Sequence, residues 1–133
     1  MNASFDTNVM IYAFTAGPKQ AAARSAMAEG GFISVQVLNE FVNVMRKKRG
    51  GAWQDIDDAL QLILAYFPDV VPITREIHRA AFELARDHSF AFYDALIVAA
   101  AVVMGCDTLY SEDMQHGRSI GGLVIVNPFL PIS

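Results

Sequence analysis

Two acidic residues in this chain stand in settings where a bare carboxylate needs an explanation. Asp6 interrupts the apolar stretch SFDTNVMIYAF directly after an expected strand, and Asp94 is the only charge in FYDALIVAAAVVMG. A helix that is apolar all round is typically buried. The helix dipole offsets only about 0.3–1 kcal/mol of the cost of burying an anion in its first turn, whereas the whole cost is several kcal/mol. We therefore expect a cation beside Asp94. A distant arginine would serve, but a metal ion is the simpler partner because no Lys or Arg is adjacent in sequence.

Two further acids, Glu40 and Asp113, are expected near the same place. Glu40 lies on a polar stripe of a predicted helix that begins just after a strand, and Asp113 follows a strand within LYSEDMQHG. Simpler interpretations exist: Asp6 as a helix N-cap, and the other two as solvated acids. Glu112 competes with Asp113 for any role. In parallel α/β sheets, however, ligands bind beyond the carboxyl ends of the strands, which is where these acids would converge.

Four converging carboxylates define a narrow range of chemistry. Without compensation they repel one another, and one or more would take up a proton. Hard oxygen donors suit Mg²⁺ or Mn²⁺, whereas zinc prefers His and Cys. Ions of this kind activate water and clamp an oxyanion, and a phosphodiester is the typical substrate. The four acids therefore predict metal-assisted hydrolysis in which water is the nucleophile.

The expected elements alternate between strand and helix, which predicts an α/β fold with a mostly parallel sheet flanked by helices. Apolar periodicity and Gly, Pro and cap signals mark them. The predicted strands are Ala3–Phe5, Phe32–Ser34, Val70–Ile73, Thr108–Tyr110 and Leu123–Val126. The predicted helical segments are Asn8–Phe14, Lys19–Glu29, Val35–Lys48, Trp53–Phe67, a helix from an N-cap at Thr74 to His88, and Ala91–Met104.

Length and composition limit the class of protein. The chain has 133 residues, of which 53% are hydrophobic and 18% charged, so we expect one compact domain over residues 1–133. No signal peptide is apparent, and the longest apolar run is shorter than the roughly 20 residues that cross a bilayer. A single cysteine excludes an internal disulfide, which favours a reducing, cytoplasmic setting without a membrane. The net charge of −4 disfavours simple nucleic-acid binding but not a nuclease whose acids hold metal ions.

The order of these motifs resembles a known family. DTNV after the first strand, NEF around Glu40, YDALIVAAA around Asp94, and LYSEDMQHG followed by IVNPF look like a PIN domain of the VapC toxin type. The match spans nearly the whole chain, and the ordered set is far more specific than DTNV alone. The resemblance implies a PIN-like three-layer α/β/α sandwich.

The resemblance also implies a function. It implies a Mg²⁺- or Mn²⁺-dependent endoribonuclease that is the toxin of a toxin–antitoxin pair, forms a homodimer and is silenced by a VapB-like antitoxin. The family's acids map onto Asp6, Glu40, Asp94 and Asp113. In this mechanism Asp6, Asp94 and Asp113 hold the metal, some through water, and Glu40 binds or orients the attacking water. The family's small polar residues that steady the cluster match Asn8 and Ser111. From the residues alone, Thr7 and Asn8 are expected to hold the turn that points Asp6 toward the site.

Basic residues that could meet RNA phosphates are few. Arg46, Lys47, Lys48 and Arg49 cluster at the end of the helix that carries Glu40, although cations at a helix C-terminus are also favoured by the dipole alone. Arg118 is a further candidate.

Rival functions remain open. One is a catalytically silent PIN fold that binds RNA or protein. Another is a phosphatase that uses Asp6 as nucleophile, although such families want a second Asp where Asn8 stands. A third is an antitoxin-like or scaffold role, which would leave the buried acid unexplained.

Overall fold

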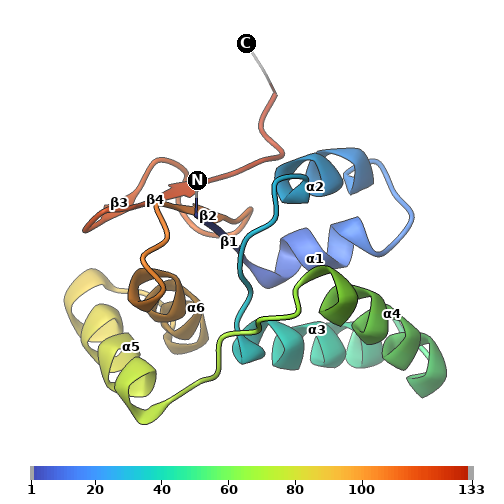
Figure 1. Cartoon of the computed structure of the whole chain (residues 1–133), viewed down its shortest axis with the longest axis horizontal. Helices are drawn as coiled ribbons and strands as arrows, with labels where there is room; N and C mark the ends of the chain where they lie inside the picture. Colours follow the sequence, from blue (N-terminus) through green and yellow to red (C-terminus); the bar gives the residue numbers. More distant parts are fainter. Residues whose placement is uncertain (1, 132–133) are drawn as a thin grey trace.

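The computed structural model describes residues 2–131 as a mostly parallel sheet flanked by helices (Figure 1). The α/β class is as predicted, but strand and helix do not alternate: among residues 2–131, six helices follow the first strand before the second strand begins. In chain order they are β1 (Ala3–Phe5), α1 (Thr7–Ala13), α2 (Gln20–Met27), α3 (Val35–Lys47), α4 (Trp53–Tyr66), α5 (Arg75–His88), α6 (Phe92–Val103), β2 (Thr108–Tyr110), β3 (Ser119–Ile120) and β4 (Leu123–Val126).

The sheet has the order β1-β2-β4-β3. β1 pairs with β2 and β2 with β4 in parallel, so that Phe5 lies beside Tyr110 and Tyr110 beside Val126. Only β3 runs antiparallel, against β4. Because the parallel strands end at the same edge, the residues that follow β1 and β2 are brought together there.

Two predicted strands are wrong in extent. Phe32–Ser34 and Val70–Ile73 are not strands; they form the isolated parallel bridges Ser4↔Phe32 and Ser34↔Val71. The backbone nevertheless pairs in the predicted direction, with Phe32 N–H donating to Ala3 O at 2.8 Å and Val71 N–H to Ile33 O at 2.9 Å. Each segment pairs with its neighbour at a single residue, which is too short to count as a strand. The short antiparallel strand β3 was not predicted.

A glycine permits the first of these contacts. Gly31 has φ +144°, and a Cβ there would lie 2.4 Å from Ala3 O. A side chain at this position would push the segment away from β1. Gly31 therefore brings the chain back onto the sheet as well as following the end of α2.

The predicted helices are confirmed with small changes at their ends. α1 begins one residue earlier than expected, at Thr7, and α2 ends at Met27 rather than Glu29. Thr74 caps α5 as predicted, since its Oγ1 accepts a hydrogen bond from Ile77 N–H at 3.2 Å. Among residues 2–131, no helix is both long and apolar enough to cross a bilayer.

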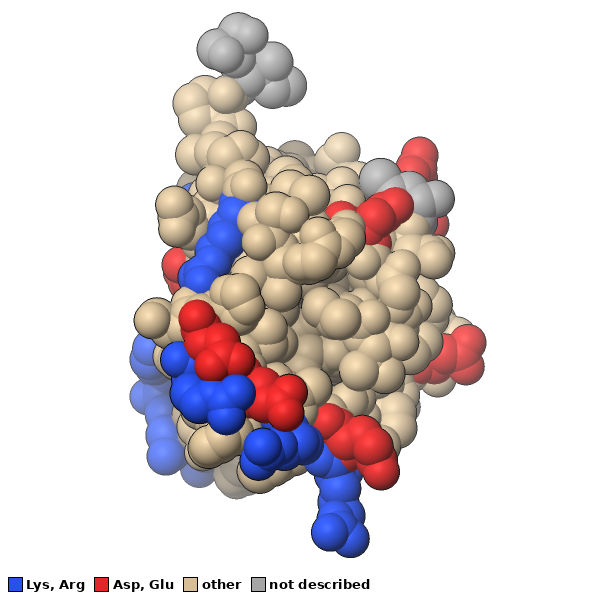
Figure 2. Space-filling view, turned by 90° about the vertical axis from the view of Figure 1, so that its left-hand side faces the viewer, with Lys and Arg blue, Asp and Glu red and all other residues tan. Residues whose placement is uncertain are grey.

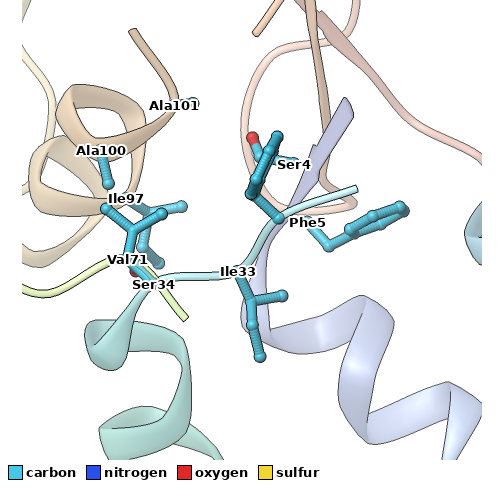
Figure 3. Close-up of a pocket in the computed structure, with 9 residues that line it drawn as sticks. Ser4, Phe5, Ile33, Ser34, Val71, Ile97, Ala100 and Ala101 are labelled. Atoms are coloured by element: carbon cyan, nitrogen blue, oxygen red, sulfur yellow. The ribbon is translucent and has the colours of Figure 1, made fainter. Parts of the chain in front are cut away.

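Helices cover both faces of the sheet. Ser4 faces α6 across a cavity of about 10 Å³ whose lining includes Ile97 and Ala100, whereas the Phe5 ring points away from α6 (Figure 3). On that opposite side Phe5 lies 5.5 Å, between ring centroids, from Phe67 at the end of α4. This gives the predicted α/β/α order. None of the four candidate acids lines the cavity in Figure 3, which belongs to the core and not to a functional site.

Candidate active site

The sheet edge places Asp6 and Ser111 side by side. Asp6 directly follows β1 and Ser111 directly follows β2, and Asp6 N–H donates to Tyr110 O at 2.9 Å, which extends the pairing by one step. Ser111 Oγ donates to Asp6 Oδ2 at 2.7 Å and accepts from Met114 N–H at 3.2 Å. Ser111 is completely buried, so it holds one Asp6 oxygen in a fixed position.

Asp6 is both a helix cap and a buried acid. Its Oδ1 accepts from Thr7 N–H at 2.7 Å at the start of α1, and the residue is only 3% exposed. Burial raises the pKa of Asp6 to about 7, with the negative charges of Asp94 and Glu40 adding to the rise and the hydrogen bonds from Ser111 and Thr7 opposing it. The interpretation of Asp6 as an N-cap was therefore correct but incomplete, because a capping hydrogen bond does not offset the free-energy cost of burying the charged carboxylate.

Glu40 reaches the same edge from α3, which packs against α1 (Figure 1). Thr7 Oγ1 donates to Glu40 Oε1 at 2.8 Å, and Gln36 Nε2 donates to Glu40 Oε2 at 3.0 Å. Gln36 precedes Glu40 by four residues, so one helical turn brings the two side chains together. Both carboxylate oxygens of Glu40 are thus oriented by neutral donors, which leaves its charge uncompensated.

Asn8 connects Asp6 to the loop after β2. Its Nδ2 lies 3.1 Å from Asp113 Oδ2 and 3.4 Å from Asp6 Oδ2, and its Oδ1 accepts from Glu112 N–H at 3.2 Å. A neutral amide can donate to two carboxylates, which a second Asp could not. This contact argues against the phosphatase alternative, which wants an acid at position 8.

Asp94 completes the cluster from the first turn of α6. Burial, and then the carboxylates of Glu40 and Asp113, raise the pKa of Asp94 above its usual value. Among residues 2–131 no hydrogen bond or ion pair reaches the Asp94 carboxylate. The described residues therefore supply no arginine for Asp94, which was the alternative to a metal ion.

Glu112 has partners of its own. Tyr12 Oη donates to Glu112 Oε1 at 2.7 Å, and Lys19 Nζ forms an ion pair with Glu112 Oε2. Although burial would raise it, the bonds from Lys19 and Tyr12 leave the pKa of Glu112 below its ordinary value. Of the two rivals for the fourth acid, Asp113 is the one whose carboxylate faces Asn8 without a basic partner among the described residues.

The donor set fits a hard divalent cation. The ion pairs within residues 2–131 are Lys19–Glu112, Arg79–Glu83 and Arg86–Asp87, so none involves the four candidate acids. The four offer only oxygen ligands, and two of them have raised pKa values because of burial and mutual repulsion. Within the same residues, no three His, Cys, Asp or Glu side chains are arranged to hold one ion directly. Mg²⁺ commonly binds through one or two carboxylates and keeps several waters, so this arrangement is compatible with it.

The basic residues proposed to contact RNA differ in whether their side chains already interact with other parts of the protein. Arg46 donates to Gly51 O at 3.1 Å and lies 4.7 Å from the Trp53 ring centroid. Arg118 donates to His88 O and lies 4.0 Å from the Phe90 ring centroid. Lys47, Lys48 and Arg49 are exposed, as Arg46 is, but their side chains have no hydrogen bond, ion pair or ring contact among the described residues. Lys47 is seven residues after Glu40, or roughly 10 Å along the axis of α3.

Sequence reasoning missed three side chains that shape the site. Gln36 was given no role, although its position four residues before Glu40 on the same helix was a usable signal. Tyr12 and Lys19 were not singled out because their partner, Glu112, lies 100 and 93 residues away in sequence. A periodic pattern in the sequence cannot indicate a contact between residues so far apart along the chain.

Fold and site together define an α/β protein with a carboxylate cluster at the carboxyl edge of a parallel sheet. Residues 4–118 match the family of the PIN domain. The chain therefore belongs to the PIN domain family, as its motifs predicted. No curated protein matches the sequence significantly.

Solved structures with the same fold come from toxin–antitoxin systems. The Mycobacterium tuberculosis toxin VapC20, described as cleaving the sarcin-ricin loop, is 21% identical with a TM-score of 0.71 over 84% of this chain and 90% of that one. A Klebsiella pneumoniae toxin–antitoxin complex is 24% identical with a TM-score of 0.73 over 96% and 98%. VapBC2 from Rickettsia felis, bound to a promoter DNA fragment, is 20% identical with a TM-score of 0.70 over 94% and 97%. At these identities the likeness establishes the fold.

Proposed function

We propose that this protein is a Mg²⁺- or Mn²⁺-dependent endoribonuclease and the toxin component of a VapBC-like module. The observation that carries the proposal is the grouping of Asp6, Glu40, Asp94 and Asp113 at one sheet edge without a basic partner among residues 2–131. Membership of the PIN domain family and the toxin structures that share the fold support the same function.

Each side chain has a distinct task in the proposed reaction. Asp6, Asp94 and Asp113 would hold the cation, partly through water, which would supply a Lewis acid beside the scissile phosphate. Thr7 and Gln36 fix the Glu40 carboxylate, which leaves it oriented to accept a proton from the attacking water. Ser111 and Asn8 hold Asp6 and Asp113 in place. The attacking group is water, because both Asp6 oxygens already accept hydrogen bonds in a buried setting.

Metal removal is the direct test of this function. We expect purified protein to cut mixed cellular RNA internally, to lose that activity in EDTA, and to regain it when excess Mg²⁺ or Mn²⁺ is added. A small phosphomonoester, assayed in parallel, should not be hydrolysed. Cleavage that continues unchanged in EDTA would contradict the proposal, and hydrolysis of the monoester alone would favour the phosphatase. Metal binding without cleavage would favour the silent PIN fold.

The partners follow from the module that we propose. The structures with the same fold include a toxin–antitoxin complex and VapBC assemblies bound to DNA. We infer a VapB-like antitoxin as protein partner, a homodimer as the toxin's own assembly, and action on RNA in the cytoplasm. A small reading frame for a DNA-binding antitoxin next to this gene is the observation that would bear on this most directly.

Phosphate contacts are expected from Lys47, Lys48 and Arg49. On the face that Figure 2 shows, basic and acidic side chains lie close together along the lower part, and on α5 Arg79 forms an ion pair with Glu83 and Arg86 with Asp87. The exposed end of α3 carries no such pairs among the described residues. Each lost contact with single-stranded RNA should flatten the plot of log binding constant against log salt by about 0.7.

We therefore expect the triple change to Gln at Lys47, Lys48 and Arg49 to reduce that slope by about 2. RNA binding should be measured in EDTA, to prevent cleavage, across a salt series. Arg79→Gln, on α5, serves as the matched loss of an exposed cation and should leave the slope unchanged. An unaltered slope in the triple variant would exclude these residues from the RNA interface.

A further inference from the structure

The Glu112 carboxylate is held on both oxygens. Oε1 accepts from Tyr12 Oη at 2.7 Å, and Oε2 pairs with Lys19 Nζ. Lys19 Nζ also lies 4.9 Å from the Tyr12 ring centroid and 5.6 Å from that of Phe129. The Tyr12 and Phe129 rings meet edge to face at 5.1 Å. The Tyr12, Lys19 and Phe129 side chains thus form one group beside the Glu112 carboxylate.

This group is connected to the carboxylate cluster through its neighbour in sequence. Glu112 N–H donates to Asn8 Oδ1 at 3.2 Å, and Asn8 Nδ2 donates to Asp113 Oδ2 at 3.1 Å. Asp113 is exposed, and Asn8 supplies its only hydrogen bond among residues 2–131. Its place therefore depends on how firmly the loop after β2 is attached to α1 and to the α1–α2 connection.

We propose that Glu112 is a positioning residue. Anchored by Lys19 and Tyr12, it sets the location of Asp113 and thereby the affinity of the cluster for a divalent cation. This inference rests on the proposed function and deepens it, because it assigns a task to three residues that the proposed reaction does not otherwise use.

The alternative tasks for Glu112 fit the contacts less well. A direct metal ligand would lack a basic partner, as Asp6 and Asp94 do among residues 2–131, yet Glu112 already has its counter-charge in Lys19 and a second hydrogen bond from Tyr12. A purely stabilising ion pair is also a weak explanation, because partly exposed pairs contribute little to folding stability. By contrast, partners that orient a metal-binding side chain typically change metal affinity or activity by about 10–100-fold when they are removed.

The test compares Lys19→Met, Glu112→Gln and the double variant with the wild type. Mn²⁺ affinity is measured by calorimetric titration without RNA, and RNA cleavage is measured across a Mn²⁺ series. We expect each single variant to bind Mn²⁺ about tenfold more weakly, and the double variant to be no weaker than either, since both changes break the same contact. Excess Mn²⁺ should restore kcat, and Lys19→Arg should recover most of the wild-type affinity.

Glu83→Gln is the matched control, since it breaks the exposed Arg79–Glu83 pair on α5 and should leave Mn²⁺ affinity unchanged. Loss of affinity in Glu112→Gln but not in Lys19→Met would show that Glu112 is itself a ligand and would overturn the proposal. Wild-type affinity in both variants would overturn it too, with the nuclease function intact. A wild type that neither binds Mn²⁺ nor cuts RNA would overturn the proposed function and this inference together.

Discussion

Asp94→Asn is expected to reduce RNA cleavage at least about 100-fold while the protein stays folded. Burial, and then the negative charges of Glu40 and Asp113, raise the pKa of the half-buried Asp94 carboxylate. This carboxylate has no hydrogen bond or ion pair within residues 2–131. Its charge is therefore available to the cation that we propose. Losing it removes several kcal/mol of electrostatic stabilisation from the reaction, and each 1.36 kcal/mol corresponds to about a tenfold change in rate.

The measurement is the initial rate of RNA cleavage at saturating Mg²⁺, with circular dichroism and thermal unfolding to verify the fold. Asp57→Asn makes the same isosteric loss of charge on the exposed face of α4 and should cleave at the wild-type rate. Identical purification of both variants excludes a contaminating nuclease. If Asp94→Asn cleaves as fast as the wild type, the proposed mechanism is wrong.

Much of the fold was predictable because its helices have strong local signals. α3, α4 and α5 have apolar residues at helical spacing, and Thr74 is a cap that forms as predicted. The parallel direction of β1, β2 and β4 was predicted from an expected alternation of strand and helix, although six helices lie between β1 and β2. The segments at 32–34 and 70–73 were predicted as full strands but form only single bridges. An apolar run indicates that a segment is buried beside a sheet, but not how many hydrogen bonds it makes to a neighbouring strand. β3 was missed because it has only two residues, and these pair only with β4, the strand that follows it in the chain.

The candidate acids Asp6 and Asp94 were predictable because each stands in an apolar stretch of sequence, where a buried charge is unfavourable. Asp94 stands alone in an apolar helix, and Asp6 interrupts a buried stretch that folds as expected. The donors around them were less accessible to sequence reasoning. Ser111 and Asn8 contact Asp6 and Asp113 across 105 residues, so only the family resemblance pointed to them. Nothing in the sequence indicated a role for Lys19 or Tyr12, because their partner, Glu112, lies in the distant loop that follows β2.

Asp6→Asn is expected to stabilise the metal-free protein at pH 8. Burial raises the pKa of Asp6 from 3.8 to about 7, so the folded state binds this proton more tightly than the unfolded state. The stability that this tighter binding gives is fully present below pH 3.8, declines as the pH rises, and is lost above about pH 7. Above that pH the charged carboxylate destabilises the folded state, by on the order of 4 kcal/mol for a shift of this size. Asparagine carries no such charge and can still accept the Thr7 N–H bond.

Thermal unfolding in EDTA from pH 4 to pH 8 measures this difference. At pH 8 the variant should melt roughly 15 °C above the wild type, which is what about 4 kcal/mol corresponds to in a domain of this size, and the gap should close toward pH 4. Mg²⁺ should raise the melting temperature of the wild type and not that of Asp6→Asn, because the ion offsets a charge that the variant lacks. Asp57→Asn should follow the wild type throughout. A variant that melts below the wild type at pH 8 in EDTA would mean that the hydrogen bonds to Asp6 outweigh the cost of burying its charge. The carboxylate would then be structural, and the site would have no need of a cation at this position.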